Sequence, residues 1–154
     1  MAKTRTGVSL ASVGKALSKA LALLTRRSYS EAELRRKLEG FDPDEVEAVV
    51  ERLRKWGYLN DQAYAQAFVA RRLRRYGPRR LRYELLRRGV SEQLVDELMN
   101  EWDEVEAAFR VLVSRAPRYR ERRERAVRFL VGRGFSLDAA LSAYERLQAE
   151  EQEG

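Results

Sequence analysis

Arginine is the residue type in this 154-residue chain whose number and spacing point most directly to a chemistry. Nine arginines and a single acid, Glu84, lie between Arg71 and Arg88, and the whole chain carries 26 arginines against five lysines. A guanidinium binds phosphate or carboxylate oxygens through two parallel hydrogen bonds, and it also stacks on bases. The formal net charge of +7 adds an attraction for polyanions. This stretch therefore predicts a basic stripe that binds phosphates or the carboxylates of a partner.

The candidate binding residues form two groups. The first group lies in the middle of the chain and consists of Arg71, Arg72, Arg74, Arg75, Arg79, Arg80 and Arg82. The second group lies nearer the N-terminus and consists of Arg26, Arg27, Arg35 and Arg36. Arg71, Arg74 and Arg75 have the i, i+3, i+4 spacing that predicts one helix face. If six such residues met phosphates of B-DNA, the log–log dependence of binding on salt would have a slope of about −5.

A solvated helix face neutralised by nearby acids is the simplest alternative for the same stripe. The segment from Gly89 to Phe109 holds seven acids and no base, so it could pair with the arginines before it. Exposed ion pairs of this kind contribute little to stability. The sequence leaves both explanations open.

The segment Leu85–Ser91 resembles the tight turn of a DNA-binding helix-turn-helix. The helix that follows would carry its acids into the major groove, and each would repel phosphate. These acids are Glu92, Asp96, Glu97 and Glu101. Sequence-specific DNA reading is therefore disfavoured.

Catalysis finds little support in the residue types present. The chain has no cysteine and no histidine, which excludes disulfides, thiolate or imidazole metal sites and histidine-based nucleophile systems. Asp42, Asp44 and Glu45 leave open a carboxylate-dependent enzyme such as a metal-dependent nuclease, but they fit a helix start better. A Gly-rich phosphate loop ending in Gly-Lys-Ser/Thr is also missing. The prediction is a protein that is no enzyme and needs no metal or cofactor.

Hydropathy predicts a cytoplasmic protein. Lys15 and Lys19 interrupt the apolar residues before Leu24, so neither a signal peptide nor a membrane span is expected. The aromatic residues Trp56, Tyr58 and Trp102 fall near apolar stripes, which favours packing over base stacking.

A three-residue motif, glycine followed by an apolar residue and then Asp or Ser, occurs three times and indicates that the chain contains repeats. Gly40-Phe41-Asp42, Gly89-Val90-Ser91 and Gly134-Phe135-Ser136 are spaced by 49 and 45 residues. In each, the glycine suits a left-handed residue after one helix, and the Asp or Ser can cap the next. The residue between them has an apolar partner at the hydrophobic-staple spacing. The chain therefore reads as three copies of one helical unit.

The apolar stripes predict an all-α fold of three tandem three-helix repeats in an elongated, curved array, because each unit is too small to bury its own stripes. After each copy of the motif, apolar residues occupy the same four positions, beginning at Val46, Val95 and Ala140. Second helices are expected after Ser30, after Tyr76-Gly77-Pro78 and after Ala116-Pro117. The predicted boundaries are a flexible arm at 1–12, repeats at 13–60, 61–103 and 104–149, and an acidic tail at 150–154.

Several segments, taken in order, resemble the bacterial RecX family over about Lys15 to Leu147. They are Arg27–Leu38, Gly57–Asp61, Phe68-Val69 with Arg71, Gly77 with Arg80-Leu81, Glu84-Leu85 with Arg88–Val90, and Arg133–Ser136. The resemblance implies three three-helix repeats and a modulator of the RecA recombinase in DNA repair, recombination and the SOS response. Such a protein would lie along the groove of the RecA–DNA filament and inhibit ATP hydrolysis, strand exchange and co-protease activity.

The resemblance also implies particular partners. They are the RecA filament and single- and double-stranded DNA bound without sequence preference, and a monomer is expected. A helical module that binds DNA in general, without a recombinase partner, is the alternative function.

Overall fold

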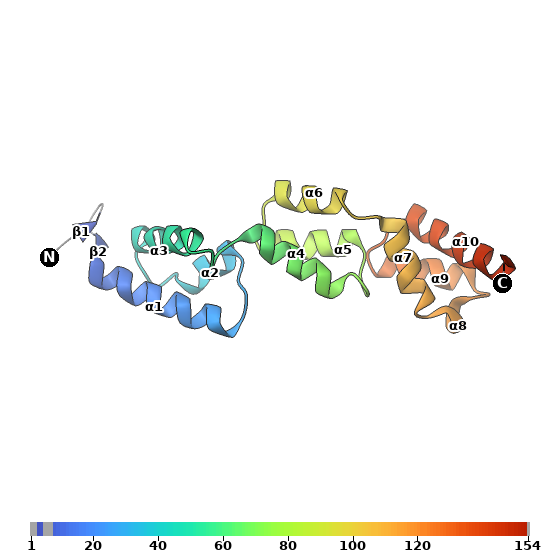
Figure 1. Cartoon of the computed structure of the whole chain (residues 1–154), viewed down its shortest axis with the longest axis horizontal. Coiled ribbons are helices and arrows are strands. Elements are labelled where there is room, and N and C mark those ends of the chain that lie inside the picture. Colours follow the sequence, from blue (N-terminus) through green and yellow to red (C-terminus); the bar gives the residue numbers. More distant parts are fainter. Residues whose placement is uncertain (1–2, 5–7, 154) are drawn as a thin grey trace. The chain divides into compact units, whose positions relative to one another are not determined.

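The computed structural model describes residues 3–4 and 8–153 of the chain (Figure 1). In chain order its elements are β1 (Lys3–Thr4), β2 (Val8–Ser9), α1 (Leu10–Arg26), α2 (Glu31–Lys37), α3 (Pro43–Lys55), α4 (Asp61–Arg72), α5 (Pro78–Arg87), α6 (Glu92–Asn100), α7 (Glu104–Val113), α8 (Ala116–Tyr119), α9 (Arg123–Gly132) and α10 (Leu137–Glu153). The predicted helical repeats are confirmed: α1–α3, α4–α6 and α7–α10 are successive copies of one helical unit.

Two features at the chain ends differ in detail from the sequence pattern. β1 and β2 form a two-residue antiparallel pair in which Lys3 lies opposite Ser9, a length too short to show as alternation. α10 continues through Glu153, so residues 150–153 are helical. α1 begins at Leu10, so the prediction of a flexible arm is wrong for residues 10–12, and residues 1–2, 5–7 and 154 lie outside the described residues. Within the described part of the chain, no helix is long and apolar enough to cross a membrane.

The chain divides into two compact units. The first contains residues 1–64 together with 88–90, and the second contains residues 65–87 together with 91–154. In the first unit the apolar stripe of α3 packs with α1, and Val49, Val50 and Leu53 are fully buried. The capping box predicted at Ser30 is present: its side chain accepts from Glu33 N at 3.1 Å, and Glu33 Oε1 accepts from Ser30 N at 3.0 Å.

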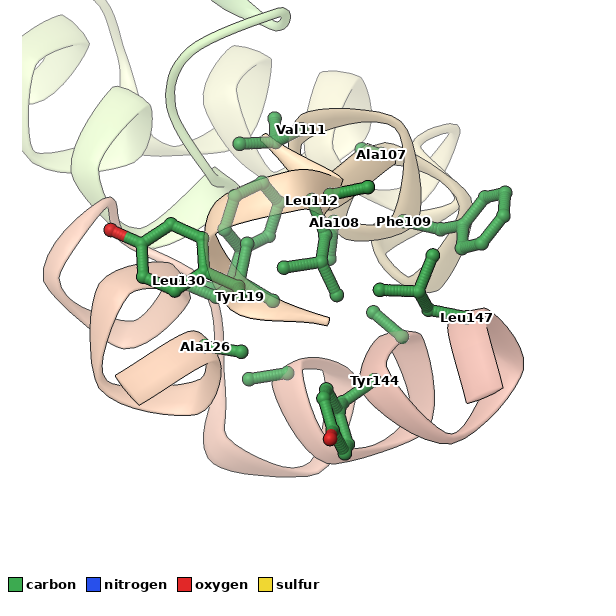
Figure 2. Close-up of a cluster of buried hydrophobic side chains, with 14 residues drawn as sticks. Ala107, Ala108, Phe109, Val111, Leu112, Tyr119, Ala126, Leu130, Tyr144 and Leu147 are labelled. Atoms are coloured by element: carbon green, nitrogen blue, oxygen red, sulfur yellow. The ribbon is translucent and has the colours of Figure 1, made fainter. Parts of the chain in front are cut away.

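The second unit has its main core in the third repeat. Side chains from α7, α9 and α10 converge there, as Figure 2 shows for Leu112, Leu130 and Tyr144. The stripe predicted for α10 is confirmed, because Ala140, Ala143, Tyr144 and Leu147 are all buried. The cap predicted at Ser136 is also present, since its Oγ accepts from Ala139 N at 3.2 Å.

The three copies of the glycine motif do not all have the same backbone conformation. Gly89 and Gly134 have φ of +85° and +102°, as predicted. Gly40 is not among the left-handed glycines, and that part of the prediction is wrong. The chain leaves α2 through a turn that Phe41 N closes on Leu38 O at 3.0 Å, and this turn needs no left-handed residue.

The third repeat departs from a three-helix pattern. The helix predicted directly after Ala116-Pro117 is the single turn α8, and the true second helix, α9, begins only at Arg123. The N-cap positions of α8 and α9 are Arg115 and Arg122, whose side chains make no capping hydrogen bond. Both helices therefore start without a side-chain cap for their first N–H groups.

Candidate functional site

The middle group of arginines begins at the C-terminal end of α4. Arg71 belongs to the helix, whereas Arg74 and Arg75 lie in the turn that follows, where Tyr76 N donates to Arg72 O at 3.0 Å. The prediction that these three residues share one helix face is therefore wrong. The helix ends early because Gly77 and Pro78 are better suited to a break than to another turn. Cations at this end face the negative pole of α4, which favours them there.

Four arginines of this group are free to meet a ligand. The side chains of Arg71, Arg74, Arg75 and Arg79, called here the middle-repeat arginines, are exposed. None of them forms an ion pair with any residue in the described ranges. Each therefore keeps its full charge and its hydrogen-bond donors for an anion from outside the chain.

The other three arginines of the middle group are engaged inside the protein. Arg82 forms ion pairs with Glu92 at 3.0 Å and with Asp96, both on α6. Arg80 lies 4.1 Å from the centroid of the Tyr76 ring and 3.4 Å from Glu84. Arg72 lies 3.7 Å from the centroid of the Phe68 ring. Pairing with the acidic helix, the simple alternative considered above, thus holds for Arg82.

This division gives the first prediction. Replacing Arg79 by Ala is expected to weaken binding to single-stranded DNA about three- to fivefold at low salt, because an unpaired cation is removed. Arg82→Ala removes the same charge from the chain but also frees Glu92 and Asp96. Arg82→Ala is therefore expected chiefly to lower the thermal unfolding midpoint of the protein, because the ion-pair contact between α5 and α6 is lost. Fluorescence anisotropy and thermal melts of both variants measure the two effects, and equal losses of affinity would contradict the division.

The second group, in the first unit, divides in the same way. Arg27 is bound to Glu33 at 2.9 Å and lies 4.2 Å from the Tyr29 ring centroid. Arg35 bridges Glu31 at 3.1 Å and Glu47 at 2.9 Å. Arg26 and Arg36 are exposed and make no ion pair with the described residues.

Glu31 is the centre of the ion pairs in the first unit. Its carboxylate accepts hydrogen bonds from Arg54, with Nε at 2.9 Å, and from Arg35, with Nη2 at 3.1 Å. Burial raises the pKa of Glu31, but these two guanidinium groups outweigh burial and bring the pKa below its ordinary 4.5. A carboxylate with a depressed pKa stabilises the fold above its unfolded-state pKa, and this contribution disappears as the pH falls through the folded-state pKa.

The second prediction follows from the lowered pKa of Glu31. Glu31→Gln is expected to unfold more easily than the wild type at pH 7, and the deficit should shrink as the pH falls from 4.5 towards 3. Asp61, whose pKa is raised by burial and by the charge of Glu31, titrates in the opposite sense, and only the part due to burial is common to both proteins. Thermal melts between pH 3 and pH 7 measure the difference. A deficit that does not change with pH would mean that the carboxylate's charge is not what stabilises this cluster.

Backbone contacts within the second unit fix the start of α5. Gly77 N donates to Arg133 O at 2.8 Å, and Arg79 N donates to Gly134 O at 3.0 Å. Tyr76 lies beside them, with the guanidinium of Arg133 5.5 Å from its ring centroid. The turn between α4 and α5 is thereby held on the turn between α9 and α10, and this positions Arg79.

Two aromatic residues lie where the sequence did not predict them. Trp56 is 53% exposed and Tyr58 is 58% exposed, so the expectation that they pack inside is wrong for both. Trp56 follows the last residue of the α3 stripe, Leu53, and after the left-handed Gly57, with φ of +79°, Leu59 is buried in place of Tyr58. Their rings meet edge to face with centroids 6.4 Å apart. Trp102, in contrast, packs on the core of the third repeat as expected.

The carboxylates proposed as an alternative catalytic site serve the start of α3. Asp42 Oδ1 accepts from Asp44 N at 2.9 Å, and Pro43 occupies the first turn. Among the described residues, no group of three or more acidic side chains is arranged to hold a metal ion.

One cluster of cations was not among the predicted site residues. Arg118, Arg125 and Arg128 line a hollow in the third repeat together with Tyr119 and Phe129. The sequence signal was present, because eight arginines lie between Arg115 and Arg133 against two acids, Glu121 and Glu124. Which of the eight gather in one place depends on the short α8, which the helical periodicity did not predict.

Three helical repeats, with cations divided between internal pairs and free side chains, place the chain in the class of basic helical-repeat proteins. Models of the second and first three-helix domains of RecX match residues 60–99 and 16–53. The regulatory protein RecX of Thermus thermophilus is 55% identical over 141 residues, which cover 91% of this chain and 96% of that protein. That of Trichlorobacter lovleyi is 40% identical over 142 residues, 82% of this chain and 92% of its own. The chain belongs to the RecX family.

Solved structures agree with this fold. The crystal structure of RecX from Lactobacillus salivarius superposes with a TM-score of 0.81 at 20% identity, covering 92% of this chain and 99% of that one. A second crystal structure, of a regulatory protein RecX, gives a TM-score of 0.70 at 26% identity, with 90% of this chain and 72% of that one covered.

Proposed function

We propose that this chain is a negative regulator of the RecA recombinase. In this proposal it binds along the groove of the RecA–DNA filament in the cytoplasm and inhibits ATP hydrolysis, strand exchange and co-protease activity. The observation that carries the proposal is membership of a regulatory family combined with exposed arginines that lack internal partners. It acts by docking as a monomer, with no chemistry of its own and no cofactor.

The proposed contact surface is the middle-repeat arginines, supported by Arg26 and Arg36 of the first unit. A filament presents both DNA phosphates and protein carboxylates, and guanidinium groups bind either. Successive repeats would each bring such contacts to the same filament. Multiple contacts raise the effective concentration of each after the first has formed, so the assembled filament is favoured over free RecA.

The alternative is a DNA-binding helical protein without a recombinase partner. It is favoured by the free arginines themselves, which would bind the phosphates of bare DNA equally well.

One pair of measurements separates the two functions. RecA ATPase on single-stranded DNA is titrated with the purified protein, and binding to the same DNA without RecA is measured under the same salt conditions. A filament regulator should halve the ATPase rate at a concentration that occupies little of the bare DNA. Inhibition that appears only when the bare DNA is saturated would favour the general DNA-binding protein.

A further inference from the structure

A hollow of about 410 Å³ opens on the surface of the third repeat. Its lining comes from two neighbouring elements: Arg118 and Tyr119 from α8, and Arg125, Arg128 and Phe129 from α9. Arg125 and Arg128 are three residues apart on one helix, so both project over the same face of α9. Three arginines therefore line one concave site.

Two of the lining residues are aromatic and pack against each other. The rings of Tyr119 and Phe129 stack with centroids 5.0 Å apart and planes 17° from parallel. Tyr119 belongs to the buried core of this repeat, where it is anchored with Ala126 and Leu130 (Figure 2). Core packing therefore fixes the aromatic part of the lining before any ligand arrives, and that part loses no entropy on binding.

The charge of the hollow is not neutralised by the protein. Arg118, Arg125 and Arg128 are exposed, and none of them forms an ion pair with a described residue. Glu121 and Glu124, the two acids of this stretch, do not line the hollow. Arg118 lies 5.7 Å from the Tyr119 ring centroid, a contact that orients a guanidinium without cancelling its charge. Cations gathered around a concave surface focus a positive potential into it.

We propose that this hollow is a phosphate-binding site for a nucleotide or for the phosphorylated end of a nucleic-acid strand. Its volume lies in the range of about 300–1,000 Å³ that is usual for small-molecule sites. Guanidinium groups match the oxygens of a phosphate with paired hydrogen bonds. None of the middle-repeat arginines lines the hollow, and binding there does not require RecA, so the proposal goes beyond the proposed function.

The test uses the full chain without RecA. Isothermal titration at about 50 mM salt measures binding of pyrophosphate, of ATP without magnesium, and of a dT12 oligonucleotide with and without a 5′-phosphate. The test variant is Arg118→Gln/Arg125→Gln/Arg128→Gln. The matched control, Lys15→Gln/Arg52→Gln/Lys55→Gln, removes the same charge from exposed positions of the first unit that lie outside the predicted binding residues. All six replaced side chains are exposed. Thermal melts are used to check that both variants fold.

The test variant is expected to lose at least tenfold in affinity for pyrophosphate and ATP, while the control stays within about twofold of the wild type. A 5′-phosphate that tightens dT12 binding only when the three arginines are present identifies a strand end as the ligand. Tight ATP binding without that effect identifies a free nucleotide. If the wild type binds neither pyrophosphate nor ATP, or if the two variants lose affinity equally, the proposal is overturned. Arg125→Lys/Arg128→Lys, which keeps the charge, should retain part of the affinity.

Discussion

Charge reversal at Arg71, Arg74 and Arg75 is expected to abolish inhibition of the RecA ATPase at concentrations where the wild type inhibits fully. The three side chains are exposed, and none forms an ion pair with a described residue, so their replacement breaks no internal contact of that kind. Each exposed cation that meets a phosphate or carboxylate contributes about 1 kcal/mol. Together they amount to about 3 kcal/mol, a loss of roughly a hundredfold in affinity.

The measurement is the titration of RecA ATPase on single-stranded DNA with wild type and with Arg71→Glu/Arg74→Glu/Arg75→Glu. Lys15→Glu/Arg52→Glu/Lys55→Glu is the matched control, because it reverses three exposed cations in the first unit that lie outside the predicted site. The control changes the net charge of the protein by the same amount. It should inhibit within about fivefold of the wild type, the difference reflecting long-range attraction alone.

Two outcomes of this experiment have different meanings. Full inhibition by the folded triple variant would refute the middle-repeat arginines as the contact surface and leave the regulatory function standing. If the triple variant and the control lose inhibition of the RecA ATPase equally, overall charge, and not a particular surface, drives the interaction. Salt dependence separates these further, since each lost phosphate contact should reduce the log–log slope by about one.

The helices were predictable because their signals are local. Ser30 with Glu33, Pro43 after Asp42, and the stripe Val46 to Leu53 each lie within one or two helical turns, and the structure confirms all of them. The repeat itself was predictable from the recurrence of such signals at nearly constant spacing. Gly40 was assigned a left-handed backbone by analogy with Gly89 and Gly134, and a different turn closes there.

The state of each arginine was not predictable, because it depends on residues distant in sequence. Arg82 is paired with α6 while Arg79, three positions earlier, is free, and no local pattern distinguishes them. Arg54 binds Glu31 across 23 residues. The exposure of Trp56 follows from the way the chain leaves α3, beyond the last residue of the periodic stripe. Composition gave the number of cations, and only packing decided which remain available.

Gly134→Ala is expected to destabilise the second unit strongly, because two independent features require glycine at this position. Its φ of +102° is a conformation that side chains rarely adopt. A Cβ there would also lie 2.5 Å from Arg80 Cβ and 2.8 Å from Arg80 N. Those atoms belong to the first turn of α5, so relief would have to come from moving the helix. Strain and displacement together are expected to cost about 3 kcal/mol, or a fall of roughly 10 °C in the unfolding midpoint.

Gly132→Ala is the matched control for this prediction. Gly132 is the last residue of α9, two positions away, and a Cβ added to it meets nothing within 4 Å. Alanine there should leave stability unchanged or raise it by up to about 1 kcal/mol, since it restricts the unfolded chain. Thermal melts followed by circular dichroism compare the two variants directly. If Gly134→Ala has the same unfolding midpoint as Gly132→Ala, the left-handed turn is not needed to pack α5 on the third repeat.

The same substitution links the fold to the proposed interface. Arg79 N donates to Gly134 O, so a displaced turn at residue 134 also displaces the free cation Arg79. At a temperature where Gly134→Ala is still folded, its affinity for DNA should fall, whereas that of Gly132→Ala should not. Gly77→Ala offers an independent check from the other side of the contact, because its Cβ would lie 2.6 Å from the backbone of Gly134. Loss of affinity in both glycine variants, with all arginines intact, would show that the junction between the second and third repeats positions the binding surface.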